Sequence, residues 1–250
     1  MLDYKEILSK DTIVQRTEEW FAIRETMLTA SDVATAIGVN PFSSSKQLLI
    51  NKRKTARETR FETDATRHGT SYEDEAIDRF CKKTGHKVHS VGIFVHPEHR
   101  WLGGSPDGLT ETCELIEVKC PFKRKIEHHV PVYYYPQVQI CMEILNIEAC
   151  YFIQYRPIMQ AGDDEILDII KVDRSKHWFN EHLPVLKQFW DDVLTYRSDL
   201  SLSTALYGIE PNKIIDFSDI SCDMHNNYAF IDDTEDTEDA SFTIPILNNM

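Results

Sequence analysis

Two carboxylates and an amine are spaced in this sequence so that they can share one site. Asp107 closes a turn rich in Gly, Ser and Pro, and Glu117 and Lys119 follow on the next predicted strand. Side chains alternate faces along a β-strand, so Glu117 and Lys119 project to the same side. A hairpin-like pairing of the two segments brings the Asp107 carboxylate beside Glu117. Two hard oxygen ligands and a nearby ammonium suit Mg²⁺-dependent hydrolysis of a phosphodiester.

The elements that must position these side chains follow from periodicity and turn signals. Helices are expected over residues 18–25, 32–37, 71–84, 137–145 and 175–194. Strands are expected over residues 87–95, 100–103, 113–119, 149–155 and 165–172. Ser31 is the expected N-cap of the second helix. Pro184 is expected to kink the last helix or to divide it in two.

The composition predicts a globular protein with a full core. The chain has 250 residues, of which 42% are hydrophobic, and this length suits one domain with peripheral additions. No segment approaches the ~20 apolar residues of a membrane span, and no signal peptide is recognised at the N-terminus. These two observations predict an intracellular location. The six cysteines form no C-x-x-C pair, so we expect reduced thiols and no zinc or iron–sulfur site.

The formal charge of −14 at first argues against a DNA-binding protein, which contacts phosphates with Lys and Arg. The charge is unevenly distributed, because residues 211–250 carry a net charge of −8. A dense acidic run over residues 232–239 has three interpretations: it keeps the chain soluble, it occupies the cleft in place of DNA, or it docks onto a basic partner. For DNA binding, the electrostatic field inside a binding cleft also matters more than the total charge of the chain.

The segment 46–67 has the opposite character. It contains seven basic residues against three acids. One interpretation is a helix and loop that contact the DNA backbone. The other is an ordinary solvated helix face, and the sequence leaves both open.

Five sequence blocks stand in the order found in one nuclease superfamily. They are Gln15–Trp20 with Arg24 and Thr29–Val33, then Gly69–Glu73, Ser105–Gly108, Glu117–Phe122 and Gln137–Gln139. The chain therefore resembles the PD-(D/E)XK nucleases, specifically the YqaJ-like recombinase branch that includes phage lambda exonuclease and viral alkaline exonucleases. The resemblance implies an α/β (α+β) fold with a restriction-endonuclease-like core, in which helices flank a central mixed β-sheet.

The same resemblance implies a domain organisation. A single nuclease domain is expected over residues 1–210, with its core at about 15–195. An acidic C-terminal extension, partly disordered, is expected over residues 211–250.

The resemblance also implies the metal ligands. Asp107, Glu117 and the backbone carbonyl of Val118 are expected to coordinate Mg²⁺, for which Mn²⁺ can substitute. Glu73 is expected to add a carboxylate from its helix and to support a second ion, although Asp74 and Glu75 on the same helix compete for this role. Without the other blocks, Asp107 would be an ordinary turn residue and Glu117 part of an exposed strand.

Three further residues have implied roles in handling water. Lys119 is expected to orient or deprotonate the attacking water and to offset charge on the phosphate. Gln137, on the following helix, is expected to help place this water. Gln139 is a weaker candidate for the same role.

A second group is implied to hold the 5′-terminal phosphate of DNA. Arg24 and Ser31 match the family's phosphate-gripping positions, and Ser105 and Lys125 are expected to complete the pocket. Ser31 is equally explained as a helix cap, and Arg24 as a surface cation. Lys125 departs from an expected arginine, and an ammonium lacks the bidentate fork of a guanidinium.

Together these expectations describe a Mg²⁺-dependent 5′-to-3′ exonuclease acting on double-stranded DNA ends, which leaves 3′ single strands for viral or phage recombination. The resemblance further implies a homo-oligomer, a single-strand annealing protein as partner, and a location in the cytoplasm or nucleus of the infected host cell. The alternatives are an endonuclease or RNase on the same fold, or a catalytically inactive nucleic-acid-binding protein.

Overall fold

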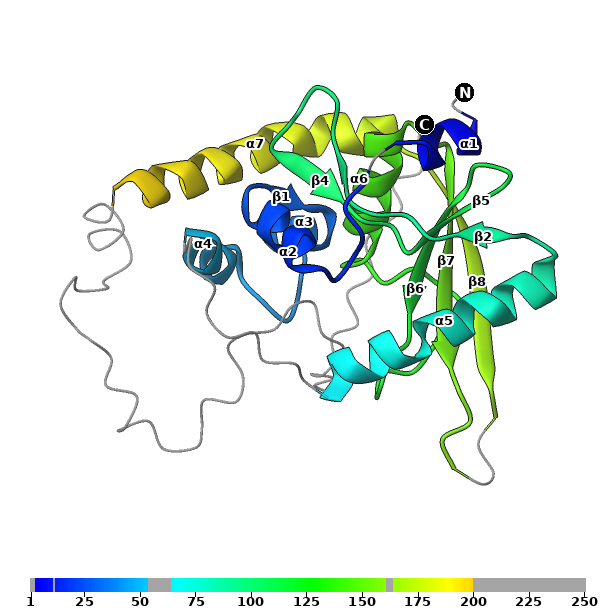
Figure 1. Cartoon of the computed structure of the whole chain (residues 1–250). Helices are drawn as coiled ribbons and strands as arrows, with labels where there is room; N and C mark the ends of the chain where they lie inside the picture. Colours follow the sequence, from blue (N-terminus) through cyan, green and yellow to red (C-terminus); the bar gives the residue numbers. More distant parts are fainter. Residues whose placement is uncertain (1–2, 11, 54–63, 161–163, 200–250) are drawn as a thin grey trace, which may run out of the picture.

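The computed structural model describes residues 3–10, 12–53, 64–160 and 164–199. The helices are α1 (Tyr4–Leu8), α2 (Glu18–Glu25), α3 (Ala30–Ala36), α4 (Ser45–Arg53), α5 (Asp64–Thr84), α6 (Tyr135–Leu145) and α7 (Lys176–Ser198). The strands are β1 (Leu28–Thr29), β2 (Val88–His89), β3 (Phe94–Val95), β4 (Leu102–Gly104), β5 (Gly108–Thr110), β6 (Leu115–Lys119), β7 (Ala149–Arg156) and β8 (Ile166–Asp173). Their arrangement is drawn in Figure 1.

Most strands join one mixed sheet. Its order is β2-β5-β6-β7-β8, in which β6 and β7 run parallel and the other neighbours run antiparallel. A smaller sheet has the order β1-β4-β3. The predicted mixed α and β fold with a central mixed sheet is therefore confirmed. The β5–β6 hairpin also confirms the pairing expected to bring the turn at residue 107 beside β6.

Helices cover both faces of the large sheet. Figure 1 shows α5 crossing β6, β7 and β8. Ala76 and Phe80 of α5 pack there against Ile116 and Val118 of β6. The larger core cluster joins the other side of β6 and β7 to α3, α6 and α7. Since side chains alternate along β6, Glu117 is directed away from α5 and toward the α6 side.

The helix predicted over residues 32–37 begins earlier, so the prediction that Ser31 is its N-cap is wrong. Helix α3 starts at Ala30 with Thr29 in the N-cap position. Ser31 lies within the first turn, where its hydroxyl accepts a hydrogen bond from Arg24.

The strand predicted over residues 87–95 is two strands that belong to different sheets. The chain leaves β2 and passes close to the backbone of Ile13 at Gly92, where a Cβ would collide with the Ile13 carbonyl. The backbone N–H of Ile93 then donates to that carbonyl (3.2 Å). This crossing separates β2 from β3, and a run of apolar residues in the sequence does not reveal it.

The predicted division of the last helix at Pro184 is wrong, because α7 is one helix of 23 residues that includes Pro184. A proline inside a helix costs about 3 kcal/mol. Helix α7 buries Phe179, Leu186, Trp190 and Val193 against the core, and this packing outweighs the local cost.

Several predictions fall outside the described residues, including the acidic extension 211–250 and residues 54–63 of the basic segment. The five described cysteines are free, as expected. No helix in the described part of the chain is long and apolar enough to cross a membrane.

Candidate active site

Asp107, Glu117 and Lys119 meet where β5 pairs with β6. The backbone N–H of Asp107 donates to the Ile116 carbonyl (3.0 Å), and the N–H of Val118 donates to the Asp107 carboxylate (2.7 Å). These bonds hold the Asp107 side chain against β6. Lys119 Nζ lies 2.8 Å from Glu117 Oε1. The structure therefore brings together the three residues that spacing had grouped.

Gln137 joins this cluster from α6. Its Nε2 donates to Glu117 Oε1 (2.5 Å), and its Oε1 accepts from Lys119 Nζ (3.4 Å). Glu117 is only 2% exposed and Gln137 8%, so this part of the cluster is buried. Gln139 is not part of it, because its amide group joins the end of β8 to the start of α7. The expectation that Gln139 lies at this site is wrong.

The buried carboxylates repel one another. Burial, and next the charge of Glu117, raises the pKa of Asp107 to about 7. Burial also raises the pKa of Glu117, although Lys119 opposes the shift. One oxygen, Glu117 Oε2, is buried and has no hydrogen-bond partner. A buried acceptor of this kind is costly unless a further positive group approaches it.

Glu73 reaches the same cluster from α5. Burial, and next the charge of Asp107, raises the pKa of Glu73 to about 7. Its carboxylate accepts from the Arg16 guanidinium, with Arg16 Nη2 2.5 Å from Glu73 Oε2. The competing acid Glu75 instead accepts from the Tyr155 hydroxyl (2.8 Å). Of these two acids, Glu73 is the one on which the charge of Asp107 acts.

The cluster fits a divalent ion that retains several of its waters. In the part of the chain that the structure describes, no group of three or more His, Cys, Asp or Glu side chains is placed so that it could hold a metal ion. Asp107 and Glu117 nevertheless supply two hard oxygen donors, and Glu117 Oε2 lacks a partner. Mg²⁺ characteristically binds through one or two carboxylates and keeps the remaining positions for water and phosphate.

A second polar cluster joins α2, α3 and the turn before β5. Arg24 Nη2 donates to Ser31 Oγ (3.0 Å), and the Arg24 guanidinium lies 4.2 Å from the centre of the Trp20 ring. Trp20 Nε1 donates to Ser105 Oγ (2.8 Å). Arg24 thus bonds directly to Ser31 and is linked to Ser105 through Trp20. The sequence had predicted no role in the site for Trp20, although it is the last residue of the first block.

Lys125 is placed differently from the other predicted phosphate ligands. Its side chain is 83% exposed, and its Nζ lies 3.6 Å from Glu127. The neighbouring Arg124 is directed inward, with its guanidinium 6.0 Å from the Tyr134 ring centre. Lys119 Nζ lies 4.8 Å from the same ring. Arg124 therefore contacts the same aromatic ring as Lys119 of the carboxylate cluster, whereas Lys125 points into solvent.

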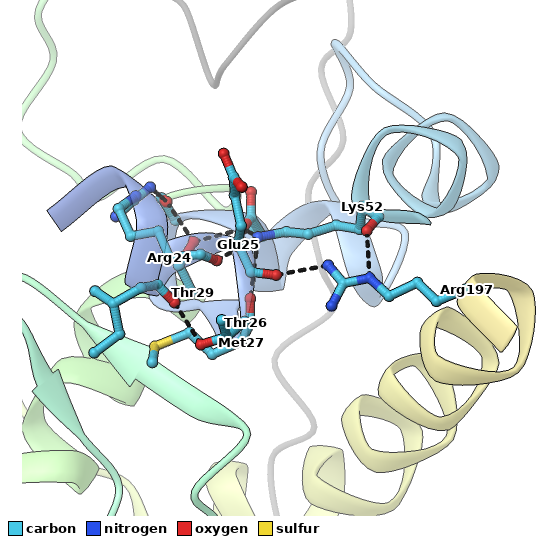
Figure 2. Close-up of polar contacts among 10 residues, drawn as sticks. Arg24, Glu25, Thr26, Met27, Thr29, Lys52 and Arg197 are labelled. Atoms are coloured by element: carbon cyan, nitrogen blue, oxygen red, sulfur yellow. Dashed lines mark hydrogen bonds and ion pairs between the residues drawn. The ribbon is translucent and has the colours of Figure 1, made fainter. Parts of the chain in front are cut away.

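Lys52 and Arg197 brace the segment that carries Arg24. Lys52 Nζ lies 2.7 Å from Asp32 Oδ2 and donates to the Met27 carbonyl (3.1 Å). Arg197 donates through Nε to the Lys52 carbonyl (2.8 Å) and through Nη2 to the Glu25 carbonyl (2.6 Å). Figure 2 shows both side chains reaching this segment from α4 and α7.

The ion pair between Lys52 and Asp32 is largely shielded from solvent. The Lys52 side chain is 13% exposed, so the solvated-face interpretation of the basic segment is wrong for this residue. Burial lowers the pKa of Lys52, whereas for Asp32 the charges of Lys52 and Arg24 outweigh burial and hold the pKa below its ordinary value. Asp32 and Lys52 are enclosed together, and each side chain is the ion-pair partner of the other.

Known proteins share sequence and fold with this chain. Residues 19–148 match the YqaJ-like viral recombinase domain. The chain is 30% identical over 164 residues to "Protein D345L" of African swine fever virus (strain Badajoz 1971 Vero-adapted), covering 53% of this chain and 46% of that protein. It is 24% identical over 189 residues to YqaJ of Bacillus subtilis (strain 168), covering 69% and 58%. The chain spans about half the length of the curated relatives it matches.

A solved structure has a similar fold. It is an alkaline exonuclease (LHK-Exo) from Laribacter hongkongensis, with 26% identity, a TM-score of 0.62, and coverage of 76% of this chain and 99% of that one. The matched domain takes up over half of the sequence and includes Glu73, Asp107, Glu117, Lys119 and Gln137. By this match, the chain belongs to the YqaJ-like viral recombinase domain family.

Proposed function

We propose that this protein is a Mg²⁺-dependent exonuclease that degrades the 5′-ended strand of double-stranded DNA from its end. One observation carries the proposal: the two polar clusters share a turn. Ser105 belongs to the cluster around Arg24, and Asp107, two positions further on, belongs to the carboxylate cluster. Two residues of extended chain span at most about 7 Å. A phosphate held at the first cluster therefore lies within reach of the second.

The residues of the carboxylate cluster have distinct tasks in this proposal. Asp107, Glu117 and the Val118 carbonyl would hold Mg²⁺, with Glu73 as an additional ligand for a second ion. Bound Mg²⁺ supplies Lewis acidity toward the phosphate and makes a coordinated water more acidic. Lys119 keeps its ammonium beside the site of reaction, where it offsets negative charge that develops on the phosphate.

Gln137 positions the other groups. Its amide bonds to both Glu117 and Lys119, which fixes the ammonium relative to the carboxylate. Fixing a catalytic group before the substrate arrives lowers the entropy cost of the reaction.

The Arg24 cluster would bind the terminal phosphate. The Arg24 guanidinium lies 4.2 Å from the centre of the Trp20 ring, and its planar set of N–H groups suits the oxygens of a phosphate. Ser31 and Ser105 add hydroxyl groups. In this proposal Arg24 selects the DNA end, and the carboxylate cluster cleaves the strand.

The comparisons support the nuclease proposal. The Laribacter relative is described as an alkaline exonuclease, and it covers 76% of this chain. A homo-oligomer and a single-strand annealing partner stay predictions from the family resemblance, as does a location inside the infected host cell.

The test compares linear duplex DNA carrying 5′ phosphates with a closed circle of the same sequence. Wild type should degrade the 5′-ended strand of the linear duplex only when Mg²⁺ is present. Lys119→Ala should lower the rate at least about 100-fold, because it removes an electrostatic stabiliser of the transition state. The matched control is Lys82→Ala, an exposed lysine of α5 paired with Asp78. Its rate should equal that of wild type.

The other outcomes separate the alternatives. Cleavage of the closed circle would indicate an endonuclease, and degradation of RNA in place of DNA would indicate an RNase. Binding to DNA ends without cleavage under Mg²⁺ or Mn²⁺ would indicate a protein that kept the fold and lost catalysis.

A further inference from the structure

Arg16 has a backbone conformation that arginine rarely adopts. Its φ is +66°, in the left-handed region that favours glycine. Non-glycine residues persist in this region where the surrounding structure fixes them, often at functional sites. The backbone of Arg16 therefore points to a specific role for its side chain.

The residues on either side of Arg16 are anchored. Gln15 Nε2 donates to the carbonyl of Pro106 (2.8 Å), directly before Asp107. Thr17 caps α2 by accepting from the backbone N–H of Trp20 (3.2 Å). Arg16 lies between these two fixed points and turns its side chain toward α5.

The Arg16 guanidinium meets a carboxylate of the proposed metal site. Arg16 Nη2 lies 2.5 Å from Glu73 Oε2. The charge of Asp107 helps to raise the pKa of Glu73, and the charge of Glu73 helps to raise the pKa of Glu117. A cation at Glu73 relieves repulsion among the three carboxylates. It also occupies an oxygen that a divalent ion would need.

We propose that Arg16 is a resident counter-ion of Glu73 that competes with a divalent cation for this carboxylate. The proposal rests on the proposed function, because it takes the Asp107–Glu117–Glu73 cluster to be the metal site. It predicts that the ion contacting Glu73 binds more weakly than an ion held by Asp107 and Glu117 alone. The left-handed backbone of Arg16 is then the local cost of keeping a cation in place.

The solvent exposure of Arg16 sets how strongly it should compete with a divalent ion for Glu73. The Arg16 side chain is 48% exposed, and ion pairs exposed to solvent are weak. Removing the guanidinium should therefore tighten divalent binding at Glu73 by about fivefold.

The test measures binding of Mn²⁺ alone to the full chain, with free Mn²⁺ determined by electron paramagnetic resonance. Arg16→Gln should lower the dissociation constant of the weaker Mn²⁺ about fivefold. Arg16→Lys keeps a cation and should remain close to wild type. Arg79→Gln, which removes an arginine of α5 that pairs with Glu165, is the matched control and should also bind as wild type does.

A second variant attributes the effect to Glu73. In a Glu73→Gln background, Arg16→Gln should no longer change Mn²⁺ binding, because the carboxylate for which the two cations compete is gone. If wild type binds Mn²⁺ and Arg16→Gln binds it equally well, the competition is refuted while the metal site stands. If wild type binds no Mn²⁺, the metal site of the proposed function fails, and the role of Arg16 fails with it.

Discussion

At the scale of single residues, the site is defined by charges that the fold forces together. Asp107, Glu117 and Glu73 come from a turn, a strand and a helix, and burial raises the pKa of each. Natural proteins tolerate such repulsion where the charges have a function. In the protein without metal these carboxylates should therefore lower the stability of the folded state at the pH at which they ionise.

Because ionisation of these carboxylates destabilises the folded state, the stability of the metal-free protein should depend on pH. The pKa of Asp107 and that of Glu73 rise to about 7 on folding, from 3.8 and 4.5. A carboxyl group with a raised pKa contributes stability that is present below its unfolded pKa and is lost as the pH rises through about 7. Asp107→Asn should therefore raise the melting temperature of metal-free protein at pH 8 by about 3 °C or more, and change it little at pH 4.

The measurement is a set of thermal melts in a chelator between pH 4 and pH 8. Asp78→Asn, which alters an exposed acid of α5 paired with Lys82, is the control and should follow wild type throughout. Parallel curves for wild type and Asp107→Asn would show that ionisation of Asp107 does not oppose folding.

At the scale of elements, the proposed phosphate cluster depends on helices that do not themselves belong to it. Lys52 of α4 and Arg197 of α7 bond to carbonyl groups around the end of α2, next to Arg24 (Figure 2). Cations near the C-terminal end of a helix are favourable, because they satisfy its last carbonyl groups. The long helix α7 therefore has a positioning task besides its contribution to the core.

Arg197→Ala should test this task. The variant loses two charge-assisted hydrogen bonds to backbone carbonyls, so its unfolding free energy in urea should fall by about 2 kcal/mol. KM for 5′-phosphorylated ends should rise several-fold while kcat changes little, since the carboxylate cluster is untouched.

The matched control at this scale is Lys187→Ala, which removes an exposed residue of the same helix paired with Asp191. It should change neither quantity. An Arg197→Ala protein with unchanged stability and unchanged KM would mean that the contacts of Arg197 do not position Arg24.

At the scale of the whole molecule, the dominant feature is negative charge on a proposed DNA enzyme. Six of the acids lie in residues 231–250, outside the described structure. Removing them changes the formal charge from −14 to −8. If the run shields the DNA-binding surface, a chain that ends at residue 230 should bind duplex DNA more tightly at low salt.

Fluorescence anisotropy with an end-labelled duplex at several salt concentrations measures this effect. The gain should be several-fold at ~20 mM salt and should fade above ~150 mM, because exposed charges are screened beyond the Debye length. Equal affinities at every salt concentration would leave the run with a role in solubility or in docking to a partner.

The residues alone predicted that Asp107, Glu117 and Lys119 meet, whereas the general fold was implied by the family resemblance. The β-strand period of two places Glu117 and Lys119 on one face, and a turn with a following strand brings in Asp107, so local rules were sufficient. The segments of β6, β7 and β8 were predictable for the same reason. Ser105 and Arg24 were predictable as site candidates only through the family resemblance, because nothing local joins them.

The pairing of Arg16 with Glu73 and the contact of Arg197 with Lys52 became known from the tertiary structure, although the family resemblance had already implied Glu73 itself. Arg16 and Glu73 are far apart in the sequence, as are Lys52 and Arg197, and neither pair has a local signal. The continuity of α7 through Pro184 likewise depends on packing against the core, which outweighs the local preference of proline. Periodicity describes what each segment buries, whereas the partners of a polar side chain are fixed by how separate segments pack in space.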